Sequence, residues 1–131
     1  MLITQLKKKE EIVSHLKGKI LVIKCLGCKE VYFPLKEIDA FISELKSTGV
    51  NVVEEIVLDY ICNEDYTKKR FEIYKENISK ADVCLVFSCG VGVQNFAALI
   101  PEKAVISGCD TIFVPGFPGV TPLEYDCDQC G

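Results

Sequence analysis

Residues 81–100 read ADVCLVFSCGVGVQNFAALI, and this segment carries a strand, a loop and a helix in succession. Residues 83–87 are apolar without interruption, which predicts a strand covered on both faces. Val93, Phe96 and Ile100 then recur at helical spacing, so we expect a helix from Val93 that Pro101 ends. A buried strand followed at once by a helix is the repeating unit of a parallel sheet.

The same unit occurs twice upstream. Residues 20–23, ILVI, predict a buried strand, and Pro34 opens an amphipathic helix that Gly49 closes. Residues 50–58, VNVVEEIVL, predict a second strand, whose adjacent glutamates favour an edge position. We also expect a Lys-rich helix over 5–17, with Ile12, Val13 and Leu16 on one face and Gly18 as its stop. A further helix is expected to be capped by Asp65, and short strands are expected at 104–106 and 111–114.

Alternation of strands and helices with short connections predicts the α/β class, with three layers and a mainly parallel open sheet. The arrangement is typical of flavodoxin-like or half-Rossmann proteins, for which the strand order 2-1-3-4 is natural. We expect one domain over residues 1–131, with a lead-in helix within 1–18 and a Cys-rich extended tail over 115–131, where Pro and Gly are frequent.

The composition narrows the classes of partner. Fifteen basic and nineteen acidic residues leave a net charge of -4, which argues against nucleic acid as the main partner. An apolar content of 49% argues against a disordered chain. No apolar run reaches the roughly 18 residues of a membrane span, and the first residues do not resemble a signal peptide. We therefore expect a cytoplasmic protein.

Eight cysteines in 131 residues suggest metal ligation, because cytoplasmic thiols stay reduced; scattered core thiols are the alternative. Cys25 and Cys28 follow the first strand, Cys62 follows the second and Cys89 the third. The carboxyl ends of parallel strands meet at one end of a sheet, so these four thiols are expected to converge there. They predict ligands for one [4Fe-4S] cluster or one tetrahedral zinc ion.

Glycines accompany two of these cysteines. Gly27 suits the tight turn of the first CxxC motif, and we expect the amides of Gly90 to Gly92 to approach a cluster and donate to its sulfurs. Two other interpretations stay open. The CxxC motif could be a thioredoxin-like redox pair, although KEVYF separates it from the next helix. The GVG loop could hold a phosphate, although it lacks the third glycine of a dinucleotide fingerprint.

The remaining cysteines are harder to assign. Cys84 lies among apolar residues of a strand and is expected in the core. Cys109 is either a spare ligand or a turn thiol. Cys127 and Cys130 form a second CxxC motif that we expect to bind metal, with its other ligands coming from the first CxxC motif or from a neighbouring subunit.

Acid-base chemistry has few candidates. His15, the only histidine, is expected on the surface away from the thiols, which argues against a nucleophile activated by histidine. Asp59, Glu64 and Asp65 flank Cys62; we expect them to be solvated and to lower the reduction potential of a nearby cluster.

The segments SCGVGVQNFAALIPEKAV at 88–105, CLGC at 25–28 and the proline-rich stretch before CDQC at 127–130 together resemble a known family. From about residue 19 to 131, the chain is similar to the Cys-rich C-terminal domain of methylenetetrahydrofolate reductase, which some bacteria and archaea have as a separate small subunit. CGVGVQ at 89–94 is the most specific part. The family usually continues past the last CxxC motif with further cysteines, and this sequence has none.

The resemblance implies an iron-sulfur or zinc accessory protein that works with a flavin-bearing reductase subunit in one-carbon metabolism. Cys25, Cys28, Cys62 and Cys89 match the family's cysteine positions. The leading expectation is an electron-transfer subunit with a [4Fe-4S] cluster. The rival is a structural zinc module that docks a catalytic partner, and a third interpretation is a small-molecule binder that uses the GVG loop.

Overall fold

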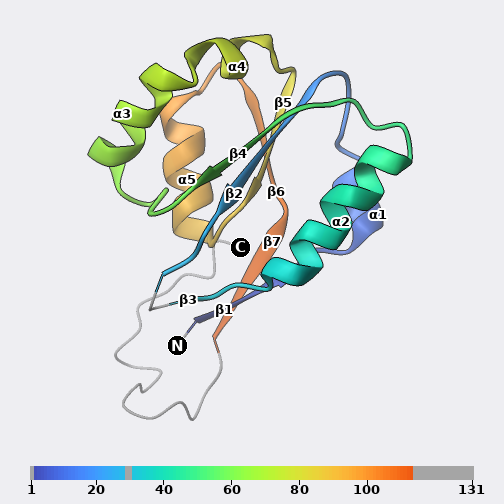
Figure 1. Ribbon diagram of the computed structural model, residues 1–131. Coiled ribbons are helices and arrows are strands. Elements are labelled where there is room, and N and C mark those ends of the chain that lie inside the picture. The colour runs from blue at the N-terminus through green and yellow to red at the C-terminus, as the bar shows by residue number, and fades with distance from the viewer. Residues whose placement is uncertain (1, 29–30, 114–131) are drawn as a thin grey trace.

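A computed structural model describes residues 2–28 and 31–113 (Figure 1). Its centre is a four-stranded parallel sheet in the order β4-β2-β5-β6. The strands are β2 (Ile20–Cys25), β4 (Val52–Leu58), β5 (Val83–Phe87) and β6 (Ala104–Ser107). The α/β class, the parallel sheet and the order 2-1-3-4 of these strands are confirmed, as is the edge position of β4. The arrangement is compatible with a flavodoxin-like or Rossmann-like fold.

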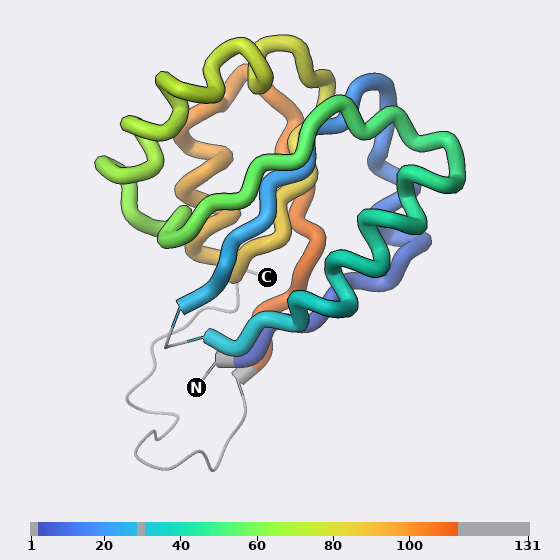
Figure 2. Tube along the Cα trace, in the orientation of Figure 1, coloured from blue at the N-terminus to red at the C-terminus, as the bar shows by residue number. Residues whose placement is uncertain are grey.

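Helices cover both faces of this sheet. The helices α1 (Lys9–Val13) and α2 (Leu35–Ser47) lie on one face, whereas α3 (Glu64–Ile73), α4 (Lys75–Lys80) and α5 (Gly90–Leu99) lie on the other (Figures 1 and 2). The predicted amphipathic helix is present, and α2 buries Ile38, Phe41, Ile42 and Leu45. The Phe41 ring meets the Phe87 ring of β5 edge to face at 6.2 Å between centroids, which joins the helix layer to the sheet.

A second sheet has three strands in the order β3-β1-β7, formed by β3 (Val31–Tyr32), β1 (Leu2–Leu6) and β7 (Cys109–Phe113). The predicted helix over 5–17 is therefore wrong: the chain starts with a strand, and only Lys9–Val13 is helical. Buried Thr4 and exposed Gln5 follow the two-residue period of a strand. The partner strand β7 lies about a hundred positions away, so no local pattern predicts the pairing.

Two further boundaries differ from the prediction. Gly18 has φ +72 but lies in the turn before β2, beyond the end of α1, and does not stop a helix. The strand expected at 111–114 exists as β7 but runs antiparallel to β1, outside the parallel sheet.

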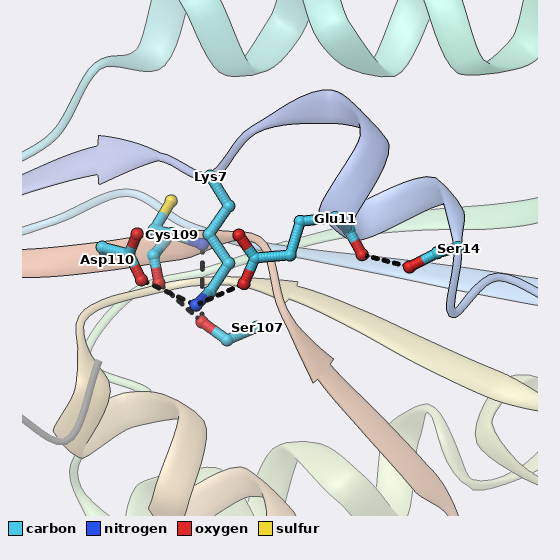
Figure 3. A network of polar contacts seen from close by, with 6 residues as sticks. All are labelled: Lys7, Glu11, Ser14, Ser107, Cys109 and Asp110. Atoms are coloured by element: carbon cyan, nitrogen blue, oxygen red, sulfur yellow. Dashed lines mark hydrogen bonds and ion pairs between the residues drawn. The ribbon is translucent and has the colours of Figure 1, made fainter.

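The two sheets are joined at Gly108, between β6 and β7. Its N–H donates to the Val86 carbonyl, and its carbonyl accepts from the Lys7 N–H, each at 2.9 Å. The Lys7 ammonium then pairs with Asp110 at 2.6 Å and with Glu11 at 3.6 Å (Figure 3). The hydrogen bond from Lys7 to Asp110 raises the pKa of Lys7 above its usual value.

The caps of two helices also correct the prediction. Asn63 caps α3, because its Oδ1 accepts from the Tyr66 N–H at 2.9 Å; Asp65 lies inside the first turn instead. The helix expected from Val93 begins at Gly90, directly after Cys89. Over residues 2–28 and 31–113, none of the helices combines the length and the apolar character that a membrane crossing needs.

Candidate metal centre

Four thiols meet at the carboxyl end of the parallel sheet. Cys25 is the last residue of β2, Cys28 lies in the loop that follows, Cys62 comes after β4, and Cys89 is the N-cap residue of α5. All four line one pocket, which we call the thiol pocket. Segments that are up to 64 positions apart thus contribute to one place, as the parallel topology leads us to expect.

The thiol pocket is small and mostly apolar. Its enclosed space is about 20 Å³, close to what a single water molecule needs. Its other lining residues are Gly27, Val31, Phe33, Tyr60, Ile61 and Ser88. Cys25 is buried and Cys89 half-buried, whereas Cys28 and Cys62 are exposed. The pocket therefore has a dry inner side and an outer side that solvent and partners can reach.

The thiols influence one another electrostatically. Burial raises the pKa of Cys62, and negative charge on Cys89, Cys25 and Cys28 raises it further. Thiolates this close repel each other, so deprotonating one makes it harder to deprotonate the next. A bound cation would remove that repulsion, because metal binding replaces the thiol protons.

The first CxxC motif folds as a tight loop. Gly27 has φ +88, and its N–H lies 3.5 Å from the Cys25 sulfur. Cys28 forms an isolated bridge with Val31, and α2 starts only at Leu35. The motif does not open a helix, which argues against the thioredoxin-like interpretation.

The acidic residues near Cys62 are largely paired with cations. Asp59 pairs with Arg70, whose guanidinium also donates to the Asp59 carbonyl. Glu64 pairs with Lys68 at 2.5 Å. The expectation that this acidic loop lowers a reduction potential is therefore weakened, because the nearby positive charges offset it.

The glycines after Cys89 make contacts within the protein. The Gly90 N–H donates to the Thr111 hydroxyl at 3.0 Å, so it is not directed at a thiol or a phosphate. Gly92 is buried against Ser88, which directly follows β5, and against the Cys62 turn. A Cβ there would clash with the Ser88 hydroxyl and lie 3.6 Å from the Ile61 Cβ. Gly92 thus allows the close packing of α5, and its expected approach to a ligand stays a prediction.

The other candidates lie elsewhere. Cys84 is fully buried in β5 with a pKa raised to about 11 by burial, as expected of a core thiol. Cys109 is buried at the start of β7, outside the thiol pocket, and burial raises its pKa to about 12, which disfavours a ligand role. His15 is exposed, as expected. Cys127 and Cys130 lie outside the described residues.

The chemistry of the donor set fits a thiolate-bound metal. Four thiols line the pocket, and its described lining residues include no histidine or carboxylate. Within 2–28 and 31–113, no three His, Cys, Asp or Glu side chains are spaced closely enough, as placed, to hold an ion. Cys28 and Cys62 are exposed and lie in loops that follow the strands. Bringing the four sulfurs close enough to bind an ion would therefore move these loops and leave the sheet in place.

The geometry defines an α/β protein with a thiol pocket at the carboxyl end of a four-stranded parallel sheet. No protein-family model, curated protein or solved structure matches this chain. The resemblance to the methylenetetrahydrofolate reductase domain accordingly stays a prediction.

Proposed function

We propose that this chain is an iron-sulfur electron-transfer protein whose [4Fe-4S] cluster is held by Cys25, Cys28, Cys62 and Cys89. One observation carries the proposal: four thiols from three separate segments line a single apolar pocket. Such a cluster, when bound, takes up and releases single electrons.

The residues of the pocket support this role in distinct ways. Cys25 is the last residue of β2, so the sheet fixes the backbone position from which its side chain extends. Cys89 lies at the N-terminus of the ten-residue helix α5, where the helix dipole favours negative charge. Val31, Phe33 and Ile61 exclude water from the inner side, which strengthens the electrostatic influence of the protein on the site.

The exposed side of the pocket supports exchange with a partner. Cys28 and Cys62 lie at the surface, so a centre held by them would be within short reach of a docked protein. As the resemblance implies, we propose a flavin-bearing methylenetetrahydrofolate reductase-like subunit in one-carbon metabolism as that partner. The chain would then be a non-catalytic subunit of an oxidoreductase.

A structural zinc site is the second candidate. The enclosed space of about 20 Å³ suits one ion better than a four-iron core. Zinc takes four thiolates in tetrahedral geometry and carries no electrons. In that case the chain would dock and orient a catalytic partner.

The first experiment is an absorption spectrum of the full chain purified without oxygen, with iron, sulfide and zinc counted on the same sample. About four irons per chain and a broad band at about 400 nm support the cluster. A colourless protein with about one zinc supports the second candidate and overturns the first. A chain that binds neither metal contradicts both.

Substitutions then assign the ligands. Cys89→Ser should remove most of the bound metal, whereas the matched control Cys84→Ser should keep it, because Cys84 lies in the core outside the pocket. The double variant Cys127→Ser, Cys130→Ser should keep the metal content if the four pocket thiols are the complete set. Full metal content in Cys89→Ser would contradict the assignment.

A further inference from the structure

The turn that carries Cys62 has an unusual backbone. Tyr60 has φ +48, in the left-handed region that residues with a Cβ rarely adopt. The next residue, Ile61, is fully buried in the thiol pocket. A left-handed non-glycine residue persists only where surrounding contacts hold it. The contacts around Ile61 therefore decide where the Cys62 thiol lies.

Two side chains hold the Ile61 carbonyl. The Asn95 amide donates to it at 2.6 Å, and the Thr67 hydroxyl donates to it at 3.0 Å. A carbonyl oxygen has two lone pairs, so these two bonds satisfy it fully. Asn95 comes from α5 and Thr67 from α3, and the turn is thereby clamped between two helices.

Asn95 connects the turn to a second thiol. It belongs to the helix that starts directly after Cys89, so the hydrogen bond links the Cys62 turn to the element that positions Cys89. The same helix contacts α3 through the edge-to-face pair of Phe96 and Phe71, with ring centroids 4.9 Å apart. This aromatic contact holds the two helices together without any contribution from the Asn95 amide.

We propose that Asn95 is a positioning residue of the thiol pocket, which acts through the Ile61 carbonyl to hold Cys62 in place relative to Cys89. The proposal rests on the proposed function, because it assigns Asn95 a role in metal binding. Without the Asn95 amide, the turn still keeps the hydrogen bond from Thr67 and the buried Ile61 side chain, so it stays packed against the rest of the protein. The fold should then persist while the position of Cys62 loosens.

Cobalt titration of the reduced, metal-free full chain tests the metal-binding part. Co²⁺ bound to several thiolates gives intense absorption that reports both affinity and tetrahedral geometry. Asn95→Leu should weaken cobalt binding about 10- to 100-fold, the usual loss when a residue that orients a ligand is removed. The control Gln94→Leu makes the same change at an exposed neighbour on the same helix and should bind as the wild type does. Equal affinity in folded Asn95→Leu and wild type would overturn the proposal.

A measurement without metal separates the two proposals. The rate of alkylation of Cys62, read by peptide mass spectrometry with Cys28 as the internal reference, should rise several-fold in Asn95→Leu. If the wild type binds no cobalt, the four thiols do not form a tetrahedral site for a single ion, and the iron and sulfide counts decide the proposed function. The alkylation rate still tests the role of Asn95 in that case. Should Asn95→Leu not fold, Asn95→Asp keeps the shape and removes the donor. An unchanged Cys62 rate in a folded variant, or an equal rise at Cys28, would refute the positioning role.

Discussion

Gly108→Ala should destabilise the protein because the methyl group has no room. An added Cβ would lie 2.5 Å from Cδ1 and 3.2 Å from Cγ of the Phe87 ring, closer than real Cβ contacts come. The ring is fully buried and packs edge to face on Phe41, so it cannot move without disturbing the core. Gly108 is also held on both sides, by Val86 and Lys7, where the two sheets join.

Two opposing effects set the magnitude. Replacing glycine by alanine stabilises by about 0.4–1 kcal/mol through the entropy of the unfolded chain, since the φ of Gly108 does not exclude alanine. Overpacking a closed core costs about 1–3 kcal/mol. The net loss should be about 1–2 kcal/mol. Urea unfolding of metal-free, reduced protein followed by circular dichroism should show a lower midpoint with an unchanged slope.

A double-mutant cycle identifies the ring as the cause. Phe87→Leu leaves more room for the new methyl group. The double variant with Gly108→Ala should therefore be about 1 kcal/mol more stable than the sum of the two single effects predicts. Gly49→Ala is the matched control: its φ of +89 penalises alanine, but nothing lies within 4 Å of the new Cβ, so Phe87→Leu should not relieve it. The reasoning is refuted if Gly108→Ala is as stable as the wild type, or if Phe87→Leu relieves both glycine variants equally.

Three other measurements test local features. Asn63→Ala should cost about 1 kcal/mol in urea unfolding because α3 loses its cap, whereas Asp65→Ala should change little; an equal loss in both would contradict the cap assignment. Burial raises the pKa of Cys84 to about 11 and of Cys109 to about 12, so above pH 9 the unfolded chain releases protons that the folded chain keeps. The free energy of unfolding should therefore fall as pH rises from 9 to 11, by up to about 1.4 kcal/mol per pH unit for each thiol, and Cys84→Ala should show a shallower decline. Lys7→Met should cost about 1 kcal/mol at neutral pH through loss of the bond to Asp110, and an unchanged urea midpoint would show that this ion pair contributes nothing.

Local sequence patterns were sufficient to predict the strands of the central sheet and the helix α2. The uninterrupted apolar run of β5 and the regular spacing on α2 each depend on neighbours within a few positions, so the sequence displays them directly. The meeting of the four thiols also followed from topology, because their places after parallel strands put them at one end of the sheet.

Features that depend on distant partners could not be predicted in the same way. The strand β3 has only two residues, and in β1 the fully buried side chain is the polar Thr4, so neither strand shows an apolar period in the sequence before its pairing is known. The bond from Asn95 to Ile61 joins residues 34 positions apart, and nothing near Asn95 indicates its acceptor. The start of α5 at Gly90 runs against the low helix propensity of glycine, and the lack of room for a side chain at Gly92 depends on Ser88 and Ile61, which the local pattern does not indicate.

The pairing of β1 with β7 has a consequence for synthesis of the chain. Lys7 directly follows β1 and Asp110 lies within β7. The two residues are 103 positions apart, an interval that a ribosome takes roughly 5–20 s to translate. Until then β1 has only the two-residue β3 as a partner. The four pocket thiols lie within residues 25–89 and are made before β7, so the residues of the thiol pocket can come together while β1 still lacks β7 as a partner.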